Sequence, residues 1–105
     1  MAMTDALERF LETGKDWQRV PVKGSPGIFV VKAPASRGRS ASLLVEVNPV
    51  GEDGAPTKRR GLMLRRRDEL ERFRRLLEDK RLEEVLDAIE RLNPASEEGG
   101  EALEI

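Results

Sequence analysis

The spacing of apolar residues changes once along this chain, near residue 66, and this change limits the folds that the chain can adopt. Before that point, short apolar segments alternate with polar residues between Gly and Pro, a pattern typical of half-buried strands joined by turns. After it, apolar residues recur every three or four positions, as in amphipathic helices. With a short amphipathic helix at the start, the pattern predicts an α+β protein.

The strand-like part predicts a four-stranded antiparallel meander over residues 17–23, 28–32, 43–47 and 58–65. A short helix precedes it, with Thr4 as its cap and Gly14 as its stop. Residues 33–42 contain no apolar anchor, so we expect a mobile loop there. Alternation gives one set of side chains that face the core, namely Val20, Val22, Leu43, Val45, Val47, Leu62 and Leu64.

Two helical segments are expected after the meander, with a bend at residues 78–80 and an end at Asn93-Pro94. We expect both to pack on one face of the sheet. Hydrophobic residues make up 38% of the 105 residues and charged residues 37%, so a chain of this length supports one domain with a thin core. We place that domain at residues 1–94, followed by an acidic, disordered tail at 95–105.

Several residue types that carry chemistry are missing. The chain has no Cys, His or Tyr, which excludes disulfides, thiolate or imidazole metal ligands and the usual neutral-pH proton carrier. The carboxylate pairs lie in turns, on a helix surface or in the tail, as solvated charges do. We therefore expect no enzyme, no cofactor and no metal. No signal peptide or spanning segment is evident, so we expect a cytoplasmic protein without membrane contact. High charge and the lack of Cys are compatible with a thermophilic source.

Charge is unevenly distributed along the sequence. Residues 58–75 have a net charge of +6, against 0 for residues 1–57 and −7 for residues 76–105. The basic stretch contains two clusters, one on each side of the predicted fourth strand, which are Lys58, Arg59, Arg60 and Arg65, Arg66, Arg67. A polyanion responds to such a local field rather than to the overall net charge of −1.

Trp17 is the only Trp, and two interpretations of it stay open: a core plug beneath the first helix, or a surface platform. Its alternation with Arg19 and Lys23 favours the surface. An exposed aromatic ring among cations stacks on an unpaired base while Arg and Lys neutralise the phosphates. Phe29 and Met63 are further candidates for base contacts, and Arg37 and Arg39 lie in the predicted loop.

The order of these segments, with Lys58 to Arg65 running into Asp68 to Leu77 and then into Leu82 to Asn93-Pro94, resembles the archaeal ThermoDBP-related single-stranded DNA-binding proteins over residues 4–94. The resemblance implies sequence-tolerant binding of single-stranded DNA, with RNA as an alternative, and oligomerisation through helices. It assigns base contacts to Trp17, Phe29 or Met63. It assigns phosphate contacts to Arg19, Lys23, Lys32, Arg59, Arg60 and Arg65.

A second hypothesis comes from a different class, a protein-interaction or transcription-regulatory module whose basic face docks an acidic partner. Both hypotheses are compatible with self-association. The apolar positions between Leu82 and Leu92 form a stripe wider than one helix contact needs, so we expect at least a homodimer.

Overall fold

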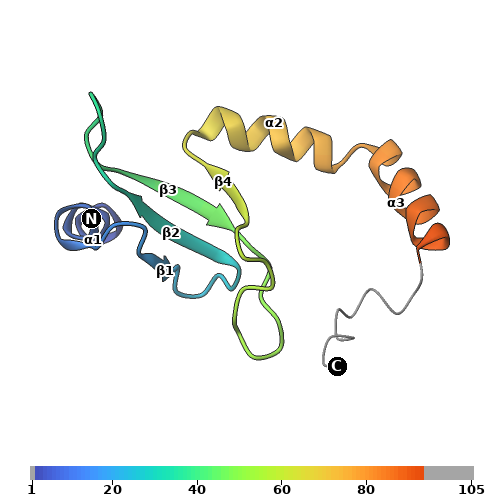
Figure 1. The fold of residues 1–105 in the computed structure, drawn as a ribbon, viewed down its shortest axis with the longest axis horizontal. Helices are drawn as coiled ribbons and strands as arrows, with labels where there is room; N and C mark the ends of the chain where they lie inside the picture. Colours follow the sequence, from blue (N-terminus) through green and yellow to red (C-terminus); the bar gives the residue numbers. More distant parts are fainter. Residues whose placement is uncertain (1, 94–105) are drawn as a thin grey trace. The chain divides into compact units, whose positions relative to one another are not determined.

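The computed structural model describes residues 2–93, and the chain divides into two compact units, Met1–Arg67 and Asp68–Ile105. The first contains helix α1 (Ala2–Thr13) and strands β1 (Arg19–Pro21), β2 (Ile28–Ala33), β3 (Ser42–Val47) and β4 (Leu62–Leu64). Helices α2 (Arg67–Leu77) and α3 (Lys80–Leu92) follow (Figure 1). This order of elements confirms the predicted α+β class with an N-terminal helix, a meander and two C-terminal helices.

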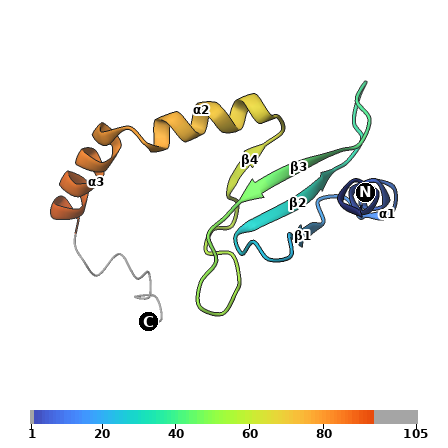
Figure 2. The ribbon, with the colours of Figure 1, turned by 180° about the vertical axis from the view of Figure 1, so that it is seen from behind.

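The four strands form one antiparallel sheet in the order β1-β2-β3-β4, and each strand pairs with the next one in the sequence (Figure 2). Directly paired residues place their side chains on the same face. The pairs Arg19 with Val31, Val31 with Leu44, and Glu46 with both Phe29 and Met63 define one such face, here called the Trp17 face. Val20, Val30 and Val45 lie on the other, here called the α1 face.

Helix α1 lies beside the α1 face. Its Met3, Ala6, Leu7 and Phe10 line a cavity of about 360 Å³ together with five sheet and turn residues, Val20, Pro21, Val22, Val30 and Val45. The predicted apolar side of this helix is therefore the side that faces the sheet. The helix begins at Ala2, so Thr4 lies in its first turn and is not the cap.

The best-buried apolar residues are not those that alternation predicts. They are Phe29, Val31, Ala33, Leu44 and Leu64, of which only Leu64 belongs to the predicted inward set. Val45 and Val47 are each 37% exposed. The difference arises because the Trp17 face is partly covered, by Arg19 and by the chain that leads into β4.

The β2–β3 connection contains a bridge that the sequence does not predict, in which Ser36 and Arg39 exchange backbone hydrogen bonds of 3.0 and 2.7 Å, and Gly38 between them has a φ of 64°. The mobility expected for residues 33–42 stays a prediction. Residues 58–61 are not part of a strand, since β4 has only three residues. The predicted tail at 95–105 lies outside the described residues.

In the second unit, the predicted bend is confirmed at residues 78–79. The Asp79 carboxylate accepts a hydrogen bond of 2.9 Å from the Arg81 N–H and caps the start of α3. The Asn93 N–H donates to the Ile89 carbonyl at its end. Leu82, Val85, Leu86, Ile89 and Leu92 form one apolar stripe, and all five are exposed.

Candidate nucleic-acid interface

Trp17 lies in a β-turn just before β1, which is closed by a hydrogen bond of 3.0 Å from the Gln18 N–H to the Lys15 carbonyl. Its φ is 62°, and no other non-glycine residue in the described range 2–93 has a positive φ. A large side chain in this left-handed conformation costs about 1–2 kcal/mol. Strain of this kind persists only where neighbouring groups hold the backbone in place.

The neighbouring groups belong to Lys32 on β2. The Trp17 N–H donates to the Lys32 carbonyl at 2.7 Å, and the Lys32 N–H donates to the Gln18 carbonyl at 3.1 Å. Two residues therefore oppose one, which is a β-bulge whose left-handed first position is normally occupied by Gly. Bulges re-aim side chains, and here the Trp17 side chain is 61% exposed. Trp17 is therefore exposed and does not plug the core, whereas its role as a platform for a base stays a prediction.

The indole borders an open cavity on the Trp17 face. The cavity has a volume of about 410 Å³ and is lined by Trp17, Leu44, Arg60 and Met63. Three of these side chains are apolar, and the fourth supplies a cation. The structure thus brings together Trp17, Met63 and Arg60, three of the predicted site residues, around a single hollow.

Glu46 and Asn48 hold the basic segment, defined here as residues 58–61, against the sheet. Both side chains are completely buried. The Glu46 carboxylate accepts from the Gly61 N–H at 2.7 Å, and the Asn48 side chain donates to the Lys58 carbonyl at 2.8 Å. The Lys58 N–H donates back to the Asn48 side-chain oxygen at 3.1 Å. Backbone groups fix the segment, so its cationic side chains need not do so.

Arg19 completes this anchor. Its Nε and Nη2 donate to the Glu46 carboxylate at 2.7 and 3.1 Å, and Nη2 also reaches the Arg59 carbonyl at 3.2 Å. Its guanidinium carbon lies 5.4 Å from the centre of the Phe29 ring, within cation–π range. Arg19 is therefore a structural cation whose charge is compensated by Glu46.

The charge state of Glu46 follows from the same contacts. Burial by itself raises the pKa of this carboxyl. The hydrogen bonds from Gly61, Asn48 and Arg19, together with the Arg19 charge, lower the pKa by more than burial raises it. The net result is that the pKa of Glu46 lies below its ordinary value of 4.5. Glu46 is thus ionised at neutral pH and holds Arg19 in place.

Two predicted contacts need correction. Phe29 is 6% exposed beneath Arg19, so its ring is not open to a base. Lys32 is 9% exposed and its Nζ donates to the Gly14 carbonyl at 3.0 Å, so it faces the protein rather than a phosphate. Arg19 is paired with Glu46, but its side chain is 34% exposed, so its phosphate contact stays a prediction. Sequence alternation placed these residues on strands but did not show what covers them.

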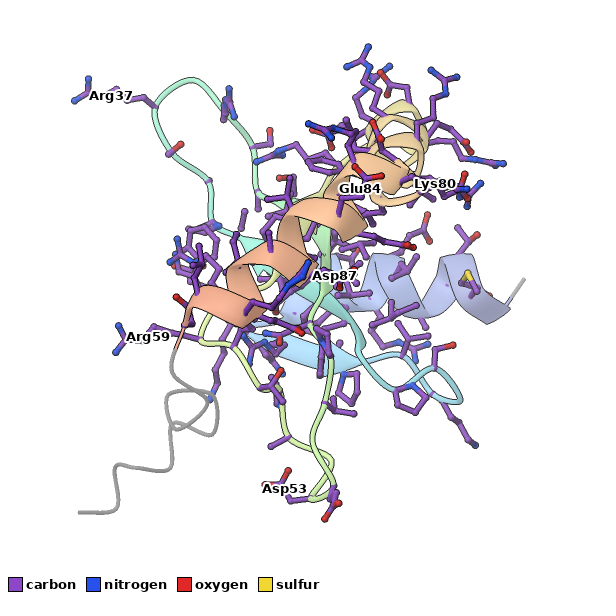
Figure 3. All side chains as sticks on the ribbon, turned by 90° about the vertical axis from the view of Figure 1, so that its right-hand side faces the viewer. Arg37, Asp53, Arg59, Lys80, Glu84 and Asp87 are labelled. Carbon is purple, nitrogen blue, oxygen red and sulfur yellow. The ribbon has the colours of Figure 1, made fainter. Side chains whose placement is uncertain are left out.

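The remaining cations are exposed at different places. Arg65 donates to the Ser42 hydroxyl at 3.3 Å, two residues before Leu44 on the same face of β3. The Arg59 side chain projects outward from the basic segment, and Arg37 projects from the tip of the β2–β3 hairpin (Figure 3). Four more are exposed without lining the cavity, which are Lys23, Arg39, Arg66 and Arg67. Lys58 is exposed at the start of the basic segment.

Sequence reasoning missed Glu46 and Asn48. A signal for them exists, because a single carboxylate alternates with Val45 and Val47 in an otherwise apolar strand, and an amide follows two residues later on the same face. Such residues at strand positions are expensive to bury without partners.

Among residues 2–93, no helix is long and apolar enough to cross a membrane, and no cluster of acidic side chains has the arrangement of a metal site. Comparisons with family models, with curated proteins and with solved structures found no match. The resemblance to the ThermoDBP-related proteins therefore stays a prediction, and the functional argument depends on the site itself.

Proposed function

We propose that this protein binds single-stranded nucleic acid, with DNA as the expected ligand, largely independently of base sequence. One observation carries the proposal: an exposed Trp, held in a strained bulge, borders an apolar hollow that also contains an Arg side chain. A base stacked on an aromatic side chain contributes about 1–3 kcal/mol whatever its identity. The proposed role is binding, without catalysis or a cofactor.

The arrangement of cations supports a ligand that extends along β3. Arg65 contacts Ser42 at one end, the hollow lies at Leu44, and the basic segment is anchored at Glu46. These positions span about 13 Å of strand at about 3.3 Å per residue. A nucleic-acid strand with one base in the hollow can therefore place phosphates near Arg65 on one side and near Arg59 or Arg60 on the other.

The first test is a titration of Trp17 fluorescence with an oligothymidylate at several salt concentrations. We expect saturable quenching and an affinity that falls steeply with salt, because bound phosphates release counterions. Duplex DNA of the same length should bind more weakly at equal salt, because its bases are not free to stack. Equal affinity for duplex and single strand would contradict the proposal.

The competing proposal, a module that docks an acidic protein partner, is supported by the same basic segment. Polyglutamate of matched charge separates the two, because it offers carboxylates but no bases. If it displaces the oligonucleotide completely and binds as tightly, the acidic-partner function is favoured. If it competes only weakly, the hollow at Trp17 contributes to binding and the nucleic-acid function stands.

A further inference from the structure

Lys32 contacts both ends of the segment that presents Trp17. Its backbone forms two hydrogen bonds with the bulge, at Trp17 and Gln18. Its Nζ donates to the carbonyl of Gly14, four residues before Gln18. The Gly14 N–H in turn donates to the Phe10 carbonyl at 2.8 Å, at the C-terminal end of α1. One residue thus links the end of the helix, the turn and the strand.

The Lys32 side chain is unusual for its position. It is buried, and no described carboxylate forms an ion pair with it. A buried ammonium is costly unless its donors are satisfied. A Met or Leu side chain would fill similar space without that cost, but neither would fix the Gly14 carbonyl. What the ammonium adds is the restraint on residues 14–18.

That restraint acts on the ring because the segment is otherwise short of contacts. The Lys15 N–H donates to the Gln18 side chain at 2.8 Å, but this bond lies within the turn and does not tie it to the sheet. The Lys15, Asp16 and Trp17 side chains are exposed. Besides the Gly14–Phe10 hydrogen bond and the continuation of the chain into β1, the bonds that tie the turn to the sheet are the two backbone bonds of Lys32 and its Nζ bond.

We propose that Lys32 is a positioning residue, whose ammonium fixes the Trp17 turn so that the indole stays beside the hollow lined by Leu44 and Met63. This inference rests on the proposed function, because the position of the ring affects binding only if a base of the nucleic acid stacks on Trp17. Lys32 touches no nucleic acid itself. Its effect on binding passes through Trp17.

The test replaces Lys32 by Met, which keeps the length and packing of the side chain and removes the donor. Lys15→Met is the matched control, because it removes an exposed lysine from the same turn without removing the bond to Gly14. Lys32→Gln is measured in parallel, since its shorter polar side chain leaves a second variant if Lys32→Met does not fold. Unfolding of both variants would overturn the proposal, because Lys32 would then be a general stabilising residue.

The primary measurement is time-resolved fluorescence anisotropy of Trp17, which needs no ligand. We expect Lys32→Met and Lys32→Gln to increase the amplitude of nanosecond ring motion, while Lys15→Met matches the wild type. Oligothymidylate affinity should fall by up to about tenfold in the Lys32 variants, a part of the full stacking contribution, with an unchanged salt slope. Wild-type ring motion in folded Lys32 variants would overturn the proposal.

A double-mutant cycle separates this proposal from the proposed function. In a Trp17→Gly background, Lys32→Met should cause no further loss of affinity, because the ring through which it acts is absent. A further loss of the same size would show that Lys32 acts independently of Trp17 and would overturn the positioning role. If the wild type binds no single strand at all, the proposed function fails, yet the anisotropy measurement still decides whether Lys32 positions the ring.

Discussion

Trp17 keeps a large aromatic ring in water and Glu46 keeps a carboxylate out of it, and both arrangements cost free energy without support. Glu46 receives four hydrogen bonds from Arg19, Asn48 and Gly61. Trp17 receives one backbone bond from Lys32 and contributes little burial in return. At the scale of single residues, Glu46 is therefore a stabilising group, whereas Trp17 is an exposed ring with little burial to stabilise it.

Trp17→Gly tests this distinction. Glycine adopts the φ of 62° without strain, so the free energy of unfolding should change by less than about 1 kcal/mol. Affinity for a labelled oligothymidylate, measured by the anisotropy of the label, should fall by about 1–3 kcal/mol with the same salt slope. A folded variant with wild-type affinity would show that the ring does not stack on a base.

Glu46 predicts a pH dependence of stability. Because its folded-state pKa is lowered, the carboxylate stabilises the fold above its unfolded pKa near 4.5, and this contribution disappears as the pH falls through the lower, folded pKa. Glu46→Gln should lower the free energy of unfolding at pH 7 by about 1–3 kcal/mol, because buried donors lose their charged acceptor.

The same variant should also show a shallower loss of stability on acidification than the wild type. Urea unfolding between pH 7 and pH 3 measures both effects. Glu52→Gln, in the exposed β3–β4 connection, is the control and should match the wild type. An acid dependence that is identical for the wild type and Glu46→Gln would show that Glu46 does not titrate with folding.

At the scale of elements, the basic segment owes its shape to groups outside it. Three of its backbone groups bond to Glu46 or Asn48 side chains, and the Arg59 carbonyl accepts from Arg19. Gly61 passes so close to β3 that a Cβ there would contact the Val47 carbonyl and lie 2.8 Å from Asn48 Cβ. The segment therefore requires both the buried polar pair and a glycine.

Gly61→Ala should accordingly destabilise the fold by about 1–3 kcal/mol, because the methyl group must displace strand backbone. The displacement should also weaken oligonucleotide binding, since it moves Arg59 and Arg60. Gly51→Ala is the matched control in the same connection, where the nearest atom would be 3.4 Å from the new Cβ. Thermal unfolding of the two variants decides, and equal midpoints would contradict the close approach at Gly61.

The cations of the segment should determine the salt dependence. Arg59→Ala and Arg60→Ala, made as separate variants, should each weaken binding to all sequences. Each should lower the slope of log affinity against log salt by roughly one unit for each lost phosphate contact. Lys23→Ala removes an exposed cation from the β1–β2 turn, away from the hollow, and should leave the slope nearly unchanged. A similar loss of slope in all three variants would indicate a diffuse field instead of a defined track.

At the scale of the whole molecule, the two units differ in charge. Residues 1–67 carry 13 basic and 7 acidic side chains, a net charge of +6, and residues 68–105 carry 6 basic and 13 acidic, a net charge of −7. The second unit also exposes the apolar stripe of α3. The polar side of this helix includes the acidic residues Glu84 and Asp87 (Figure 3). Apolar surface of this kind marks an interaction site more often than an isolated exposed residue does.

Self-association through α3 is therefore the prediction at this scale. Light scattering at micromolar concentration should give the mass of a dimer or a larger assembly. Ile89→Lys should shift it toward the monomer, because a charge is placed in the apolar stripe. Asp87→Lys on the polar side of the helix is the control and should leave the mass unchanged. A monomeric wild type would refute the prediction.

Periodicity predicted the fold well, because hydrophobic spacing is a local property. The spacing of apolar residues predicted all seven helices and strands of the described chain, and a break in the helical spacing predicted the bend at Asp79. It did not predict which face of the sheet is better covered. That depends on the basic segment folding back over β3, a contact between residues 15 apart such as Glu46 and Gly61.

The site was predicted in part for the same reason. Trp17, Arg60 and Met63 line one hollow. Alternation predicts a shared face for Trp17 and Met63, whereas Arg60 is a candidate only as a member of the basic cluster. Phe29 is a predicted base contact because it is aromatic, and Lys32 is a phosphate contact that only the family resemblance implies; both are buried. A bulge at a Trp leaves no mark in a pattern of apolar residues, since its usual sequence signal is a glycine.

The buried side chains of Glu46 and Asn48 hold the backbone of residues 58–61. The side chains at positions 58–60 are therefore not needed to maintain that backbone conformation. Their identities can therefore change while the loop keeps its form, provided that Gly61, Glu46 and Asn48 are retained. The side chains of the segment can therefore be exchanged while its backbone conformation is kept. Lysines, amides or aromatic residues at these three positions should therefore change the exposed surface of the segment and leave the core as it is.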